Sequence, residues 1–311
     1  MHLGLDPATT LPHAGAALST AVALGLRALP LGAGLFGGGR FDGQVALVTG
    51  AGSGIGEACA LELARRGADL ALLGRRADRL EAVAAAVRAT GRRALSLPCD
   101  VTDHAALGAA VQAAVDGLGG LDLALANAGA GVNGRLEVTP VEQWRRQFEL
   151  NVLGVVSTAQ HCLPHLRARQ GRLGLVGSVM GFLSLAGSGP YASSKAAVRS
   201  IGATLRLELA GSGVSCTTIH PGFVESEIGL VDNRGELNPE RVDRRPQKLM
   251  WPADKAAAVM ADAIFSRRRE HVFTAHGKAA GFLGRHLPGL VHFVATRGAI
   301  KAKSIVNDKT R

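Results

Sequence analysis

The chain has 311 residues, of which 47% are hydrophobic, 19% charged and 4% aromatic, and it carries a formal net charge of +10. That length provides one large domain or two small ones with a well-buried core, and high hydrophobicity with low charge density excludes a disordered chain. So few aromatic residues argue against a protein that stacks nucleic-acid bases, and we expect no nucleic-acid partner. Tyr191 is the single tyrosine.

Residues 1–40 are predicted to form an apolar N-terminal extension outside the main domain. The apolar stretch Ala16–Phe36 is interrupted by Arg27 and Pro30, whereas a helix that spans a membrane needs about 20 consecutive apolar residues. A signal peptide would carry positive charge ahead of its apolar stretch, and this chain has only Asp6 there. We therefore expect an extension that packs on the main domain or stays mobile.

From residue 44 onward, short apolar runs alternate with stretches rich in Ala, Leu, Arg and Glu, such as Ile55–Arg66 and Asp78–Thr90. Strands that are apolar throughout and alternate with helices indicate a parallel sheet covered on both faces. Right-handed crossovers then give an α/β fold with a Rossmann-like, doubly wound, seven-stranded parallel sheet, which binds ligands beyond the carboxyl ends of its strands. The predicted strands are Val45–Thr49, Leu70–Leu73, Ala94–Leu97, Leu121–Ala126, Leu173–Gly177, Val214–Ile219 and His271–Thr274.

A glycine-rich turn, Thr49–Gly56, follows the first predicted strand and opens the next helix. Glycines let the chain turn tightly and bring backbone N–H groups against a pyrophosphate at the helix N-terminus. The strict G-x-G-x-x-G spacing is not met, because Ile55 and Glu57 occupy the places where the last glycine belongs. Taken alone, these glycines fit a purely structural turn equally well.

Other residues accompany this turn in a fixed order: Asp100-Val101, Asn127-Ala128-Gly129, Asn151, Ser178, Tyr191-Ala192-Ser193-Ser194-Lys195 and Pro221-Gly222. With this set the chain resembles the short-chain dehydrogenase/reductase family over about residues 42–275. The turn fits the family's T-G-x-x-x-G-x-G motif, and Tyr191 with Lys195 fits its Y-x-x-x-K motif. The resemblance implies a catalytic domain at 41–275 between the extension and a tail at 276–311, and a homo-oligomer, either a dimer or a tetramer.

The resemblance implies a catalytic set of Asn151, Ser178, Tyr191 and Lys195. Four residues span little more than one helical turn, so Tyr191 and Lys195 share a helix face. A nearby ammonium would lower the tyrosine pKa from about 10, so that the phenol could protonate a carbonyl oxygen as hydride reaches the carbon, or act in reverse. Ser178 would hold the substrate oxygen. In the family, Asn151 holds a water connected to Lys195, which also binds the nicotinamide ribose.

The end of the second strand bears on the choice of cofactor. An acidic residue there would bind the adenosine ribose and favour NAD, but this chain has Gly74 followed by Arg75 and Arg76. Guanidinium groups bind a phosphate in a bidentate way, so we expect NADP(H) rather than NAD(H). The alternative is that these arginines begin a solvated helix face.

The resemblance places Asp100 on the adenine, and the Val224 backbone with the Ser226 hydroxyl on the carboxamide. The full predicted cofactor set is Gly50, Gly52, Ser53, Gly54, Ile55, Gly56, Arg75, Arg76, Asp100, Val101, Asn127, Ala128, Gly129, Tyr191, Lys195, Pro221, Gly222, Val224 and Ser226.

Three stretches should line the substrate pocket, namely Ala130–Leu136, Val179–Pro190 and Phe223–Trp251. Apolar residues such as Phe182 predict a small hydrophobic ketone, aldehyde or alcohol as substrate. The polar stretch Arg234–Lys248 is expected to be a mobile lid, whose arginines either meet an acidic substrate or are simply solvated. No metal site is expected, because His161 and His165 have no third ligand.

The positive charge is concentrated near the C-terminus, where residues 267–311 contain ten Lys or Arg and only two acidic residues. Within the tail, 277–303 has the pattern of a basic amphipathic helix interrupted at Pro288. Such a segment makes peripheral contact with an anionic membrane, or packs on the main domain or a second subunit.

Four widely spaced cysteines suit buried thiols in a reducing compartment, which predicts a cytoplasmic protein, with membrane association through the tail as the alternative. The predicted function is an NAD(P)(H)-dependent oxidoreductase, a carbonyl reductase by its substrate. The alternative is a nucleotide-binding scaffold of the same fold, or a membrane-associated binding protein, without turnover.

Overall fold

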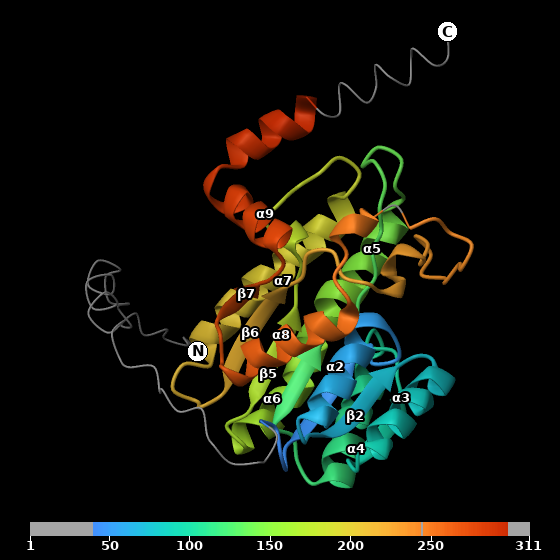
Figure 1. The fold of residues 1–311 in the computed structure, drawn as a ribbon, viewed down its shortest axis with the longest axis vertical. Helices are drawn as coiled ribbons and strands as arrows, with labels where there is room; N and C mark the ends of the chain where they lie inside the picture. Colours follow the sequence, from blue (N-terminus) through green and yellow to red (C-terminus); the bar gives the residue numbers. More distant parts are fainter. Residues whose placement is uncertain (1–39, 244, 298–311) are drawn as a thin grey trace, which may run out of the picture. The chain divides into compact units, whose positions relative to one another are not determined.

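Seven parallel strands form one sheet in the part of the chain that the computed structural model describes, residues 40–243 and 245–297 (Figure 1). The order across the sheet is β3-β2-β1-β4-β5-β6-β7, and every neighbouring pair runs parallel. The strands are β1 (Val45–Thr49), β2 (Asp69–Gly74), β3 (Ala94–Pro98), β4 (Leu123–Ala126), β5 (Arg172–Val176), β6 (Ser215–His220) and β7 (Glu270–Val272).

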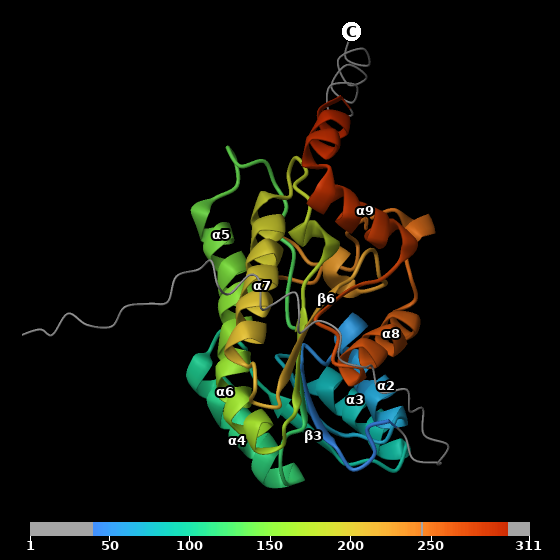
Figure 2. The ribbon, with the colours of Figure 1, turned by 90° about the vertical axis from the view of Figure 1, so that its left-hand side faces the viewer.

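Helices cover both faces of the sheet, which Figure 2 shows nearly edge-on. One face packs against α2 (Gly54–Arg65), α3 (Ala77–Ala89) and α8 (Ala253–Phe265), and the other against α4 (His104–Leu118), α6 (Gly154–Ala168) and α7 (Gly189–Glu208). Two further helices are α5 (Val141–Phe148) and α9 (Ala275–His286). The predicted Rossmann-like, doubly wound sheet with helices on both faces is therefore confirmed.

The predicted strands lie within two residues of the observed ones, and the last strand differs most clearly. It ends at Val272 rather than Thr274, because Thr274 adopts a φ of +67° and turns the chain into α9. The Thr274 hydroxyl accepts a hydrogen bond from the Gly277 N–H at 3.0 Å, which caps the helix. A run of apolar residues predicts a strand, but it does not show where the strand ends and the N-cap of the next helix begins.

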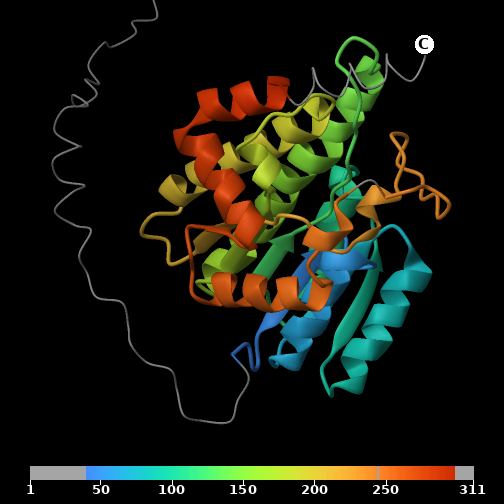
Figure 3. The ribbon, with the colours of Figure 1, turned by 45° about the horizontal axis from the view of Figure 1, so that its top comes forward.

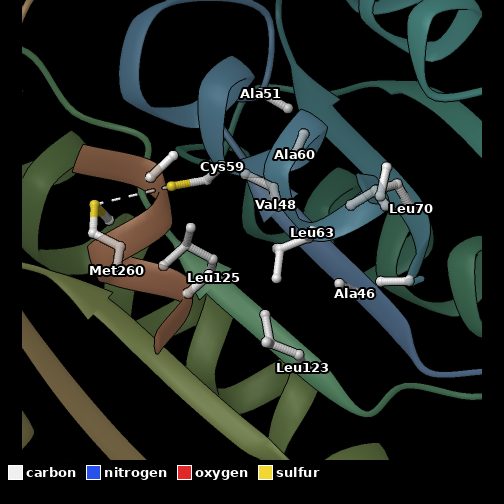
Figure 4. Packing of buried hydrophobic residues seen from close by; sticks show 14 of the residues in the cluster. Ala46, Val48, Ala51, Cys59, Ala60, Leu63, Leu70, Leu123, Leu125 and Met260 are labelled. Carbon is white, nitrogen blue, oxygen red and sulfur yellow. Dashed lines mark hydrogen bonds between the residues drawn. The ribbon is translucent and has the colours of Figure 1, made fainter. Parts of the chain in front are cut away.

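The core between α2, α8 and the central strands shows why apolar runs mark this sheet (Figure 4). Leu63, Leu123 and Leu125 are almost fully buried, and the Sγ of Cys59 lies 3.9 Å from the Sδ of Met260. All four cysteines are buried and unpaired, as expected. Burial raises the pKa of Cys59, Cys162 and Cys216 to about 12, so these thiols resist ionisation.

The predicted N-terminal extension lies outside the described residues. Of the C-terminal tail, 276–297 is described: α9 ends at His286, and residues 288–297 form a second helical stretch. The interruption predicted at Pro288 is confirmed, with the break at Leu287. Within residues 40–243 and 245–297, no helix is long and apolar enough to cross a bilayer.

The carboxyl ends of the strands meet at one edge of the sheet, and the candidate residues lie along it. Figure 3 shows the segment after β6 (orange) and the tail helices (red) on this side of the molecule. In a parallel sheet this edge is where loops gather to form ligand sites.

Candidate active site

The glycine-rich turn joins β1 to α2 and lies directly against the end of β4. The Thr49 hydroxyl accepts hydrogen bonds from the backbone N–H groups of Asn127 and Ala128, each at 3.0 Å, and the Asn127 amide donates to the Thr49 carbonyl at 2.9 Å. A Cβ on Gly56 would stand 2.1 Å from the carbonyl oxygen of Gly50. Only glycine allows α2 to begin this close to the end of β1. Free N–H groups at a helix N-terminus could hold a pyrophosphate here.

The remaining residues of the turn have separate local roles. Gly50 and Gly54 have φ values of +65° and +54°, which side-chain-bearing residues rarely adopt. Ser53 is extended and immediately precedes α2. A Cβ on Gly52 would stand 3.2 Å from the Arg79 Cβ, and Ile55 packs partly buried against the core.

Arg75 and Arg76 follow β2 as the sequence places them, and Arg79 joins Arg76 from the first turn of α3. Gly74 ends the strand and Arg75 is exposed. The Arg76 guanidinium lies 2.7 Å from one oxygen of Glu227, and Arg79 lies 3.0 Å from the other. The sequence did not predict Glu227 near these arginines. Its carboxylate lies where the predicted phosphate contacts are.

Of the two predicted residues after β3, Asp100 lies at the sheet edge and Val101 lies in the core. The Asp100 carboxylate accepts from the backbone N–H of Thr102 at 3.0 Å and from its hydroxyl at 2.9 Å. Val101 is buried among core residues, and Ala128 after β4 packs partly buried against the same group. Any contact of Val101 with a cofactor would therefore involve its backbone.

Asn151 is fully buried in a π-helical turn, Glu149–Leu153, between α5 and α6. Its side-chain oxygen accepts from the Ala130 N–H at 3.0 Å, and its amide donates to the Ala130 carbonyl at 3.0 Å and to the Ser194 hydroxyl at 3.1 Å. A Cβ on Gly129 would stand 3.1 Å from the same side-chain oxygen. Asn151 thus ties the chain after β4 to α7, and π-helical turns often occur at functional sites.

Lys195 is buried on α7, one turn after Tyr191. Its ammonium donates to the Val176 carbonyl at 2.8 Å and lies 5.9 Å from the centroid of the Tyr191 ring. Burial lowers the pKa of Lys195 to about 8. The two side chains therefore approach each other as their spacing predicts, but the ammonium is hydrogen-bonded to the end of β5.

Burial raises the pKa of Tyr191 above its ordinary value of 10.0. A hydrogen bond with the Ser178 hydroxyl and the charge of Arg245 each oppose this rise. Lys195 is not among the groups that lower the Tyr191 pKa, and the expected lowering is not found, because desolvation of the phenol dominates. Ser178, which follows β5, also accepts a hydrogen bond from the Met180 N–H at 3.1 Å.

The segment after β6 packs tightly on the start of α9. The Pro221 carbonyl accepts from the Val179 N–H at 3.0 Å. A Cβ on Gly222 would stand 2.4 Å from His276 Nε2 and 2.5 Å from Thr274 Oγ1, which excludes larger residues. This packing fixes the path of the chain just before the predicted carboxamide contacts.

Arg245 contacts Val224 and Ser226, the two residues predicted to bind the carboxamide. Its guanidinium donates to the Val224 carbonyl at 2.9 Å, to the Ser226 hydroxyl at 3.1 Å and to the Ser226 carbonyl at 2.8 Å. It also pairs with Asp243 at 2.7 Å. The lid arginine is therefore anchored rather than solvated; Arg244 lies outside the described residues.

His220 and Glu270 extend the site behind Ser178. His220 Nδ1 lies 3.1 Å from the Ser178 carbonyl, and Nε2 lies 2.8 Å from a Glu270 oxygen. Burial alone would raise the pKa of Glu270, but His220, Arg285 and Arg199 together lower it to about 2. This ion-pair network joins β6, β7, α7 and α9, and the sequence motifs did not indicate it.

Phe182, predicted to line the pocket, also contacts the tail. The guanidinium groups of Arg199 on α7 and Arg285 on α9 lie 4.5 and 4.4 Å from the centroid of its ring. His161 and His165 both lie in α6. Among the described parts of the chain, no three His, Cys, Asp or Glu side chains gather in a way that could hold a metal ion.

Comparisons with known proteins agree with this geometry. The sequence model of the short chain dehydrogenase family matches residues 44–236. An uncharacterized oxidoreductase of Myxococcus xanthus is 40% identical over 191 residues, which cover 61% of this chain and 76% of that protein.

Two solved structures have similar folds. An alcohol dehydrogenase of Thermococcus sibiricus, complexed with 5-hydroxy-NADP, is 29% identical with a TM-score of 0.62, covering 70% of this chain and 89% of that one. A short chain dehydrogenase/reductase of Burkholderia phymatum, complexed with NAD, is 30% identical with a TM-score of 0.71, covering 78% of this chain and 93% of that one.

Because Tyr191 is the only tyrosine, tyrosinate absorbance reports on this residue alone. We expect the phenol of the cofactor-free protein to titrate above pH 10.0, because burial raises its pKa. Arg245→Met and Ser178→Ala should each raise the midpoint further, since each removes a group that lowers the pKa. Circular dichroism over the same pH range checks the fold, and Arg135→Met serves as an exposed control. A wild-type midpoint below 10, or a lower midpoint in Arg245→Met, would contradict this account.

Proposed function

Since the chain belongs to the short chain dehydrogenase family and is an oxidoreductase of that type, we propose that it interconverts a hydrophobic ketone or aldehyde and the corresponding alcohol, with NADP(H) preferred over NAD(H). The observation that carries the proposal is the meeting of Ser178 and Tyr191 beside Lys195 at the carboxyl edge of the sheet. A hydroxyl, a phenol and a buried ammonium at one place form a proton-transfer site next to a turn that fits a dinucleotide.

In this proposal the nicotinamide, when bound, supplies or accepts the hydride. The Ser178 hydroxyl holds the substrate oxygen, and the Tyr191 phenol donates its proton to that oxygen during reduction or takes one during oxidation. Lys195 keeps its ammonium directed at the Val176 carbonyl and so maintains positive charge near the ring. Asn151 fixes the chain after β4 against α7 and positions both groups.

The preference for NADP(H) rests on the residues at the end of β2. Gly74 supplies no carboxylate for a ribose, and the exposed Arg75 and the half-exposed Arg76 are close enough along the chain to grip one phosphate. The T. sibiricus enzyme was crystallised with an NADP derivative and the B. phymatum protein with NAD, so relatives of this fold accommodate either.

A hydrophobic substrate is supported by the apolar residues of the surrounding loops. Leu136 and Leu185 project from the loops after β4 and β5 with 78% and 48% of their surface exposed. Ile228 and the Tyr191 ring both lie within 4 Å of where a Cβ on Gly131 would stand. An apolar side chain near the phenol and exposed leucines in the loops after β4 and β5 favour a ligand with an apolar body and one polar atom at the carbonyl.

The tail is proposed to contact an anionic membrane surface. The glycine face of α9 packs on the body, where a Cβ on Gly281 would stand 3.6 Å from the Phe182 ring. Within the described part of the tail, five large apolar side chains are exposed, namely Phe282, Leu287, Leu290, Phe293 and Val294. Cations lie among them, and the sequence from 267 onward has a net charge of +8, which suits anionic lipid better than a neutral partner surface. We further propose a homo-oligomer, as the family resemblance implies, and a cytoplasmic location, which suits four unpaired cysteines.

Replacing Tyr191 with Phe should abolish turnover without abolishing cofactor binding. We expect wild-type protein to oxidise NADPH with members of a panel of hydrophobic ketones, and Tyr191→Phe to be slower by about 100-fold or more, because the proton donor is lost. Binding of NADPH, measured by its fluorescence, should be largely retained, because Phe keeps the ring and removes only one hydroxyl from the predicted cofactor contacts. If the wild-type protein binds NADPH but no ketone or alcohol reacts in either direction, the non-catalytic scaffold replaces the proposed function.

Replacing Arg75 with Ala should weaken the binding of NADPH more than the binding of NADH. The loss of a charged hydrogen bond to phosphate corresponds to an increase in Kd of about 10-fold for NADPH, with little change for NADH. Arg88→Ala, near the other end of α3, is the matched control. A wild-type preference for NADH, or equal weakening of both cofactors by Arg75→Ala, would refute the NADP(H) assignment.

The membrane contact is tested with the double variant Phe282→Ser/Phe293→Ser, which changes only exposed side chains. Wild-type protein should float with vesicles that contain anionic lipid and float less with neutral ones, whereas the double variant should lose most of this binding. Leu207→Ser, an exposed apolar residue on α7, should bind as the wild type does. Equal binding by the double variant would disprove the contact, and its conversion from dimer to monomer would assign the face to a subunit interface instead.

A further inference from the structure

Glu227 places both of its carboxylate oxygens on the arginines at the end of β2. One oxygen lies 2.7 Å from Arg76 and the other 3.0 Å from Arg79. The Ser53 hydroxyl of the glycine-rich turn also bonds to this carboxylate. Burial alone would raise the pKa of Glu227, but Arg76 and its neighbours lower it, so the side chain is an anion within a basic cluster.

The backbone near Glu227 lies directly on the glycine-rich turn. The Ser226 Cβ is 2.9 Å, and the Glu227 backbone nitrogen 3.9 Å, from where a Cβ on Gly54 would stand. Ser53 and Arg76 belong to the residues proposed above for the cofactor. A carboxylate of the protein therefore takes the hydrogen-bond donors that a phosphate ester would otherwise use.

We propose that Glu227 is a specificity-determining residue: an internal anion that holds the phosphate-binding arginines and competes with the 2′-phosphate of NADP(H) for them. This inference rests on the proposed NADP(H) preference. A phosphate monoester carries nearly two negative charges and pairs with guanidinium in a bidentate way, so it can displace a single carboxylate. NAD(H) has no such phosphate and leaves the Glu227 contacts in place. Glu227 thus weakens the binding of NADP(H) selectively, and the protein's affinities for NADP(H) and NAD(H) become more similar.

The exposure of these groups makes the exchange feasible. About half of the Arg79 side chain and a quarter of the Glu227 side chain are exposed, and ion pairs at such positions are weak because water competes for both partners. The same segment also places Arg245 on the Val224 carbonyl and the Ser226 hydroxyl, the proposed carboxamide contacts. Two independent contacts therefore hold this segment on the proposed cofactor site.

A different role for Glu227 would give the opposite selectivity. A carboxylate at this position could accept hydrogen bonds from the hydroxyls of an unphosphorylated ribose, as an acidic residue after the second strand does in NAD-binding folds. Removal of its charge would then weaken NAD(H). The sign of the change for each cofactor separates the two roles.

The test compares Glu227→Gln with Glu225→Gln, a matched control that removes the same charge from an exposed side chain two residues earlier. Calorimetry measures the Kd of NADPH and NADH, together with adenosine 2′,5′-bisphosphate and ADP as probes without nicotinamide. We expect Glu227→Gln to bind NADPH and the bisphosphate about threefold to fivefold more tightly, with NADH and ADP unchanged within about twofold. Glu225→Gln should match the wild type, and the melting temperature of each variant checks folding.

Each other outcome overturns the proposal in a distinct way. Weaker NADH binding by Glu227→Gln would assign the carboxylate to the ribose hydroxyls. A general charge effect would be indicated if Glu227→Gln bound NADPH and NADH more tightly by the same factor. The same conclusion would follow if Glu225→Gln gained as much affinity as Glu227→Gln. If the wild-type protein binds neither NADPH nor NADH, the proposed cofactor itself fails, whereas normal NADPH binding with no change in Glu227→Gln removes only the role of Glu227.

Discussion

The site depends on the close approach of the β1–α2 turn to the end of β4. Gly56 has no space for a Cβ, and Thr49 holds the backbone after β4 through its hydroxyl. This contact brings the N-terminus of α2 level with the carboxyl ends of two central strands, so the N–H groups of the helix and the loop after β4 face one region. Asn151 then ties that loop to α7 by three hydrogen bonds. Through these links, the positions of the phenol and the ammonium on α7 follow from a close contact on the other side of the sheet.

Burial affects the two titrating groups on α7 in opposite ways, and both effects favour the neutral form. It raises the pKa of Tyr191 and lowers that of Lys195 to about 8. A phenol that keeps its proton is the form needed to protonate a carbonyl oxygen. Ser178 and Arg245 moderate the rise, so the acidity of the phenol depends on both a residue after β5 and a residue of the segment after β6. That segment is therefore part of the electrostatics of the site.

The sequence predicts the sheet well because its five inner strands are buried on both faces, and burial leaves short runs of mostly apolar residues. The residues at the strand ends are also predictable, since the motifs are local and their order is fixed. The contact of Glu227 could not be predicted, because its partner Arg76 lies 151 residues earlier in the chain. No periodicity encodes such a pair. The contacts of Arg245 with Val224 and Ser226, 21 and 19 residues earlier, depend on how the segment after β6 folds back on itself. Spacing placed Lys195 beside Tyr191 but could not reveal that its ammonium binds a strand carbonyl.

Charge is distributed differently in the tail and in the site. The net charge of the chain comes mostly from residues 267–311, whereas charges of the segment after β6 are paired: Glu227 lies on Arg76 and Arg79 at the start of α3, and Arg245 is paired with Asp243. In the proposed cofactor complex, a dinucleotide phosphate that binds Arg76 or Arg79 replaces the contact with Glu227. The affinity for the dinucleotide then depends on the difference between the contacts that it makes and the similar contacts within the protein that it replaces. Small changes in the charge of one segment can for that reason shift cofactor preference without any change in the sheet or the catalytic residues.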